Sequence, residues 1–196
     1  MRWRATVLCV ALLAQYRPAL AQDSPPGQDT ISAKRVAGTS FDVLKGLAGS
    51  WTGSVTTDPH NPDIEGPIQV TMRVASRGSL LEHEIAPGGV PEPSMIYVEG
   101  DRLTLVHYCE AGNRPRLVAR SPADSKTVDF EFADISGSTM PVYLQHFVFT
   151  IVSADHHTED WTFQLPDEKQ LHAHFDLKRA TESTPTRANR ARARPH

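Results

Sequence analysis

Three ionisable side chains fall among apolar residues in segments that alternate like β-strands. His83, His107 and Glu159 each lie two positions from a large apolar residue, and residues two apart share one face of a strand. A buried carboxylate or imidazole without a partner costs several kcal/mol or changes its pKa. We therefore expect the three to meet inside the fold and orient the polar end of a ligand. The alternative is that the three residues only hydrogen-bond to one another inside the fold, or lie near a rim of the barrel where they reach water.

Two further residues share this inward face, namely Cys109 beside His107 and Trp161 beside Glu159. The predicted ligand-binding residues are therefore His83, His107, Glu159, Trp161 and Cys109, and no catalytic residue is assigned. A Cys109–His107 nucleophile would need a cationic setting to hold a thiolate, and no oxyanion donors can be identified. A single cysteine is also more often a small buried apolar residue than a nucleophile.

Other chemistry-bearing motifs give weaker signals. His172 and His174 share one face of a strand, and the register places that face outward, so no metal site is predicted. The pair His156-His157 reads as a solvated turn. The sequence has no phosphate-binding glycine loop, no GxSxG elbow and no CxxC motif.

The elements that must position these residues are strands. Period-two alternation and turn residues predict strands near 50–57, 66–76, 79–86, 94–99, 102–109, 115–121, 126–133, 143–153, 157–165 and 169–178. A short helix is predicted near 40–47, with Ser40 as its N-cap. The fold class is therefore all-β: a single antiparallel meander barrel of eight to ten strands with a short N-terminal helix, closed so that no edge strand remains.

The last three strands allow a prediction of register. Placing Phe149 opposite Trp161, and Phe163 opposite Leu171, gathers the large apolar side chains on one face. We assign that face to the interior. Trp51 between two glycines heads the first strand, where its indole could plug one end of the barrel.

The chain divides into four parts. Residues 1–21 have the basic start, apolar run and small-residue end of a signal peptide, so export to the periplasm or medium is expected, with cleavage before Gln22. Residues 22–38 read as a disordered leader, 39–179 as the barrel domain, and 180–196 as a disordered Arg-rich tail. No apolar run is long enough for a transmembrane span. The formal charge of the barrel part, near −9, argues against nucleic acid as a partner.

Three segments give the chain a family resemblance: 44–53 (LKGLAGSWTG), 105–116 (LVHYCEAGNRPR) and 157–163 (HTEDWTF). With the signal peptide and meander, they resemble the calycin (lipocalin-like) superfamily, and most closely a family of uncharacterised secreted bacterial lipocalin-like barrel proteins. The resemblance implies a barrel with an internal cavity and carries over no catalytic residue. Nitrobindin-like barrels in this superfamily take haem through a histidine, so His107 or His83 is a candidate ligand. No other cofactor is predicted.

The expected function is binding of a small, mostly apolar or amphipathic molecule in the barrel cavity. An enzyme that uses the same His and Glu side chains as general acid and base is the first alternative. An envelope structural or partner-binding protein with a solid core is the second. Cavity volume separates the solid-core protein from the other two.

Overall fold

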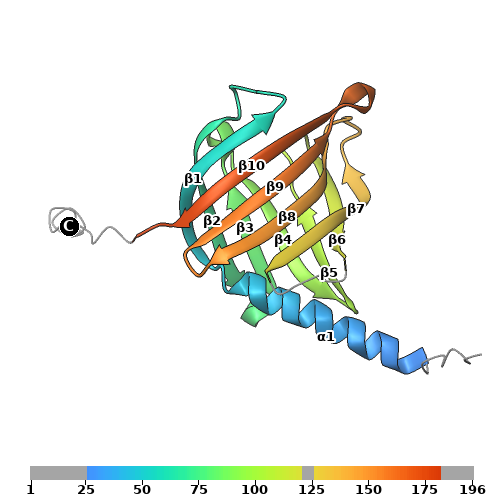
Figure 1. Cartoon of the computed structure of the whole chain (residues 1–196). Helices are drawn as coiled ribbons and strands as arrows, with labels where there is room; N and C mark the ends of the chain where they lie inside the picture. Colours follow the sequence, from blue (N-terminus) through green and yellow to red (C-terminus); the bar gives the residue numbers. More distant parts are fainter. Residues whose placement is uncertain (1–25, 121–125, 182–196) are drawn as a thin grey trace, which may run out of the picture.

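Ten strands form a closed antiparallel barrel in a computed structural model that describes residues 26–120 and 126–181 (Figure 1). Each strand pairs with the next, and β1 pairs with β10 to close the barrel. The strands are β1 (Gly49–Asp58), β2 (Gly66–Ala75), β3 (Leu80–Ile85), β4 (Glu92–Glu99), β5 (Arg102–His107), β6 (Asn113–Ala119), β7 (Thr127–Gly137), β8 (Tyr143–Ser153), β9 (His156–Gln164) and β10 (Gln170–Arg179). The fold class predicted from the sequence is confirmed. The predicted signal peptide and nearly all of the predicted tail lie outside the described residues.

The predicted register is right on one side of β9 and wrong on the other. Phe163 lies opposite Leu171 on β10, as predicted. On β8, however, Trp161 faces Phe147 rather than Phe149, a shift of two residues. One residue of the shift comes from a shorter turn, in which Ser153 pairs with His156, and the other from an irregularity between Ile151 and Ser153 that skips one residue of β8. Because the shift is even, every predicted inward residue of these strands keeps its face.

The N-terminal helix is longer than the sequence predicted. Helix α1 spans Pro26–Lys45 and occupies most of the segment 22–38 that was predicted to be a disordered leader. Its docked face explains the difference, because Ala37, Phe41 and Leu44 are buried at helical spacing. The polar composition of 22–38 predicted disorder, but the half-buried residues Ala33 and Val36 continue this face toward the N-terminus. None of the described helices combines the length and apolarity needed to cross a bilayer.

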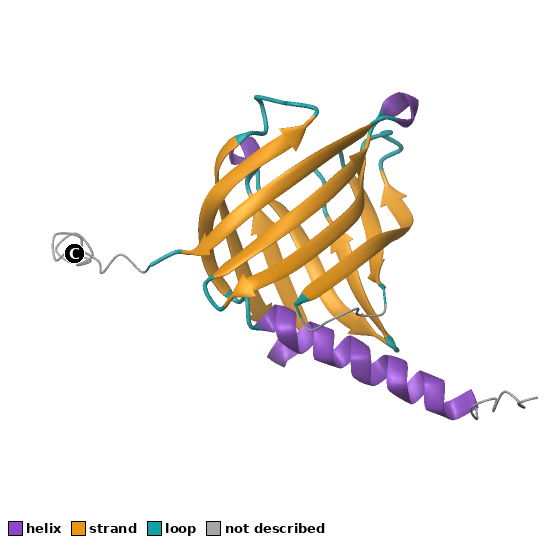
Figure 2. Cartoon of the chain, in the orientation of Figure 1, coloured by secondary structure: helices purple, strands orange, loops and turns teal. Residues whose placement is uncertain are grey.

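The two ends of the barrel are different (Figure 2). Helix α1 lies across one end, where the last residues of β10 also lie. At this end the Trp51 indole N–H donates to the Leu47 carbonyl at 2.8 Å, and the Arg179 guanidinium stacks 4.3 Å from the Trp51 ring. The loops β1–β2, β3–β4, β5–β6, β7–β8 and β9–β10 surround the opposite end, which we call the mouth.

Side chains fill the middle of the barrel. Phe130, Phe147, Phe149 and Trp161 are all fully or almost fully buried there. The strands β1 and β10 approach so closely that a Cβ at Gly53 would collide with the backbone carbonyl of Asp176. Most residues predicted to face inward are buried. Val74, at the end of β2, is an exception and remains 39% exposed.

Candidate functional site

A fully buried carboxylate, that of Glu159 on β9, lies at the centre of the barrel. His83 Nε2 donates to its Oε1 at 3.0 Å, and His157 Nε2 donates to the same oxygen at 3.1 Å. The Trp161 indole N–H donates to Oε2 at 3.0 Å. All four side chains have at most 1% exposure. We call these four residues the carboxylate cluster. An ionised carboxylate accepts hydrogen bonds and donates none, so the three donors around Glu159 match its ionised form.

The cluster holds Glu159 in its ionised form. Burial raises the pKa of this carboxyl group, but the charge of His83 and the hydrogen bonds from His157 and His83 lower it. The net result is a pKa of about 2, against an ordinary value of 4.5. Glu159 is therefore a fixed negative charge at neutral pH, surrounded by aromatic rings.

A second buried group of three residues, Glu92, Ser94 and His107, lies closer to the mouth, on β4 and β5. The Ser94 hydroxyl and His107 Nδ1 share a hydrogen bond of 2.9 Å, and His107 Nε2 lies 3.5 Å from Glu92 Oε2. Glu92 Oε1 accepts the backbone N–H of Glu110 at 2.9 Å. Burial raises the pKa of Glu92, while His107 and the Glu110 amide lower it, and the net direction is downward. Glu92 is therefore a second ionised carboxylate.

The Trp161 indole connects the two groups. Its ring centroid lies 5.8 Å from that of His83 and 5.4 Å from that of His107. Its N–H is fixed by Glu159, so the ring has a defined orientation. The alternation along β3, β5 and β9 thus brings His83, His107 and Glu159 into one interior space.

A pocket of about 420 Å³ opens at the mouth, above the indole of Trp161. Its wall includes apolar side chains from β1, β2, β3 and β10: Val55, Ile68, Ile85, Leu171, Ala173 and Phe175. The polar part of the lining is Asn61, Asp63, Glu92, Cys109 and Glu110. A pocket of this size and composition suits a small, mostly apolar molecule.

The five predicted ligand-binding residues separate into two groups. Trp161 and Cys109 line the pocket. His83, His107 and Glu159 are fully buried and are not among its lining residues. Their role in this geometry is to hold Trp161 and Glu92, which do reach the pocket. Burial raises the pKa of the Cys109 thiol, so this cysteine is not poised as a nucleophile.

Two site residues were missed in the sequence. The sequence predicts that His157 lies in a solvent-exposed turn, but the residue is fully buried and donates to Glu159. Its position two residues before Glu159 on the same strand was the available signal. Glu92 was missed because the predicted strand began at 94, whereas β4 begins at Glu92 and places that residue on the inward face with Ser94.

The pocket does not offer a histidine to haem. Among the residues that the structure describes, those lining the pocket include no imidazole, and the interior histidines His83, His107 and His157 are enclosed by other side chains. Among the described residues, no group of three or more His, Cys, Asp or Glu side chains has the geometry to hold a metal ion. On β9 and β10, His174 Nδ1 instead lies 2.6 Å from Asp160 on the outer surface.

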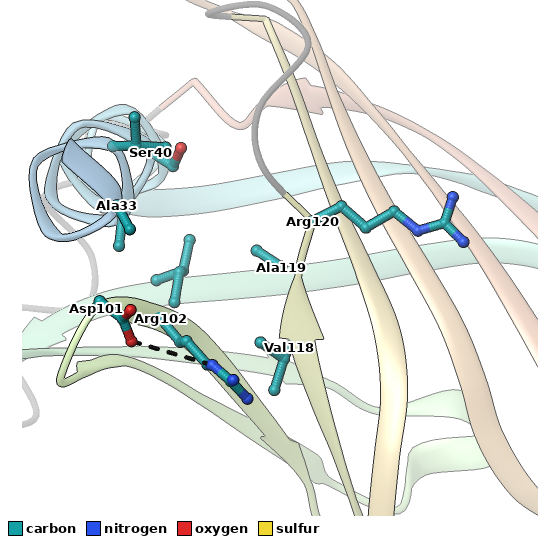
Figure 3. Close-up of a pocket in the computed structure, with 10 residues that line it drawn as sticks. Ala33, Ser40, Asp101, Arg102, Val118, Ala119 and Arg120 are labelled. Atoms are coloured by element: carbon teal, nitrogen blue, oxygen red, sulfur yellow. Dashed lines mark ion pairs between the residues drawn. The ribbon is translucent and has the colours of Figure 1, made fainter. Parts of the chain in front are cut away.

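A second hollow, of about 310 Å³, lies at the other end of the barrel (Figure 3). Helix α1 forms one side of it through Ala33 and Ser40, and the end of β6 forms another through Ala119. The only ionic contact drawn there joins the neighbouring residues Asp101 and Arg102, 4.0 Å apart. None of the residues lining this hollow belongs to the carboxylate cluster, so it has no connection with the buried charges.

A solved structure of low sequence identity shares the barrel fold. Rv2717c from M. tuberculosis matches with a TM-score of 0.55 and 16% identity, over 72% of this chain and 98% of that one. A protein of unknown function from the DUF3598 family of Nostoc punctiforme matches with a TM-score of 0.49 and 8% identity, over 70% of this chain and 48% of that one. No family model and no curated protein matches the sequence significantly. The barrel and its likeness to Rv2717c are compatible with a lipocalin-like fold.

Proposed function

We propose that the protein binds a small, mostly apolar molecule in the mouth pocket. The observation that carries the proposal is the pocket itself, a mostly apolar concavity of about 420 Å³ at the mouth of the barrel. A volume of this order lies within the range of roughly 300–1,000 Å³ of small-molecule sites. Burial of apolar ligand surface would supply affinity at about 25 cal/mol per Å².

The floor of the pocket supports the same proposal. The Trp161 indole is held by its hydrogen bond to Glu159 and packs 5.3 Å from the ring of Phe175, another lining residue. Side chains that are already ordered lose little entropy when a ligand binds. The carboxylate cluster therefore acts as a rigid base for an apolar binding surface.

The test is binding of a simple amphiphile, 1-decanol, measured by calorimetry below its solubility limit. Ala173 lines the pocket, and Ala173→Phe would fill part of it. We expect this variant to lose at least tenfold in affinity. His172→Phe adds the same ring to the outer face of β10 and should bind as the wild type does. Equal binding by both variants, with both folded by circular dichroism, would refute the proposed site.

The identity of the natural ligand requires a different measurement. Native mass spectrometry of protein purified from the organism that makes it would reveal a retained molecule by its mass. We expect an apolar or amphipathic metabolite, which Ala173→Phe should fail to retain.

A further inference from the structure

We infer that the ligand of the mouth pocket carries a protonated amine, an inference that rests on the proposed function. In the described part of the chain, the charged side chains that line the pocket are Asp63, Glu92 and Glu110, and no lysine, arginine or histidine is among the lining residues. An apolar pocket whose only charges are carboxylates favours a hydrophobic ammonium ion and disfavours a fatty acid.

Glu92 is the group best placed to receive the ammonium. It is only 8% exposed, yet it lines the pocket. Its Oε1 is held by the Glu110 backbone N–H, which fixes the direction of the carboxylate. Its Oε2 faces His107 Nε2 at 3.5 Å, a long contact that leaves this oxygen able to accept a short hydrogen bond. An ammonium group offers three N–H donors, and a charge-assisted bond to Oε2 would be short and strong.

Asp63 and Glu110 play a different part. Both side chains are exposed, Asp63 in the β1–β2 loop and Glu110 in the β5–β6 loop. Charges in such positions attract a cation toward the mouth but contribute little to its final affinity, because water and salt screen them. The amine of the ligand would therefore lie beside Glu92, with its chain against Trp161, Phe175 and Leu171.

The experiment compares three ten-carbon probes that differ only in their polar end: decylammonium, 1-decanol and decanoate. Each is titrated into the full mature chain at neutral pH, below its micellar concentration. We expect decylammonium to bind at least tenfold more tightly than 1-decanol, and decanoate to bind most weakly. Added salt should weaken only part of the preference for decylammonium, because Glu92 is buried.

Glu92→Gln keeps the shape of the side chain and removes its charge. We expect it to lower decylammonium affinity about tenfold more than it lowers 1-decanol affinity. Glu84→Gln removes the same charge from the exposed outer face of β3 and should change neither. If Glu92→Gln does not fold, the relative affinities of the wild-type protein for the three probes decide the question.

The outcomes separate this inference from the proposed function. If 1-decanol binds but decylammonium binds no more tightly, the inference is overturned while the apolar pocket stands. If Glu92→Gln folds and retains the preference for decylammonium, the inference is likewise overturned. If none of the three probes binds, the proposed function fails, and this inference fails with it.

Discussion

His83 and Glu159 meet inside the barrel although 76 positions separate them in the chain, and Nε2 of one lies 3.0 Å from Oε1 of the other. His83 comes from β3 and Glu159 from β9, which are not neighbours in the barrel. The contact therefore crosses the interior and ties together walls that share no backbone hydrogen bonds. Breaking it should affect the whole fold rather than one hairpin.

Glu159→Gln should destabilise the protein by about 3–5 kcal/mol at neutral pH. The amide offers one oxygen to three donors and brings an N–H₂ group of its own, so at least one buried donor loses its partner. Chemical denaturation measures the free energy of unfolding. The control is Asp160→Asn, which removes an exposed carboxylate from the adjacent position and should cost less than about 1 kcal/mol. Similar losses for the two variants would contradict the role of the cluster.

The stability of the protein should fall in acid because of Glu159. Its pKa in the fold, about 2, lies below the ordinary 4.5, so folding favours the ionised form. The resulting stabilisation, on the order of 3 kcal/mol, is fully present above the ordinary pKa and is lost as the pH falls through the folded value. Unfolding free energies measured across this range should decline in the wild type. The Glu159→Gln variant should lack this decline. If the free energies of unfolding of the wild type and the variant fell in parallel with pH, Glu159 would not be its source.

Gly53→Ala should destabilise the barrel by about 2 kcal/mol or more, because the new Cβ would meet the Asp176 carbonyl and separate β1 from β10. These are the strands that close the barrel. Ser54→Ala, at an exposed position next in the same strand, should stay within about 0.5 kcal/mol of the wild type. Thermal melts followed by circular dichroism would show the difference.

The docked face of α1 can be tested at Ala37, which is 6% exposed. Ala37→Asp would bury a carboxylate against the barrel and should cost about 1–3 kcal/mol. Arg35→Asp introduces the same side chain on the exposed face of the helix and should have little effect. If Ala37→Asp proved as harmless as Arg35→Asp, this part of the helix would not be packed against the barrel in solution.

Export remains a prediction from residues 1–21. We expect the mature protein to begin at Gln22, with an N-terminal residue and intact mass that reflect cleavage after Ala21. Mass spectrometry of protein from the producing cells checks this. An uncleaved Met1 in the cytosolic fraction would show that the segment is not a signal peptide.

The alternation of side chains was enough to predict the barrel and the burial of His83, His107 and Glu159. It worked because each strand has one inner and one outer face, so even a two-residue shift in β8 left every face assignment intact. The separation of these residues from the pocket was not predictable, because depth along the barrel axis depends on strand tilt and on bulges. His157 was missed for a local reason: the β8–β9 turn is shorter than the predicted three residues, since Ser153 pairs directly with His156.

The placement of α1 and of the end of β10 on the side away from the mouth has a practical consequence. The Ala180 N–H still donates to the Ser50 carbonyl, at 2.8 Å, before the chain leaves the barrel. A tether, a reporter or a sensor surface attached beyond either of these elements would therefore point the open pocket outward. The molecule could be immobilised at the end that α1 covers, which would leave the mouth accessible to solvent.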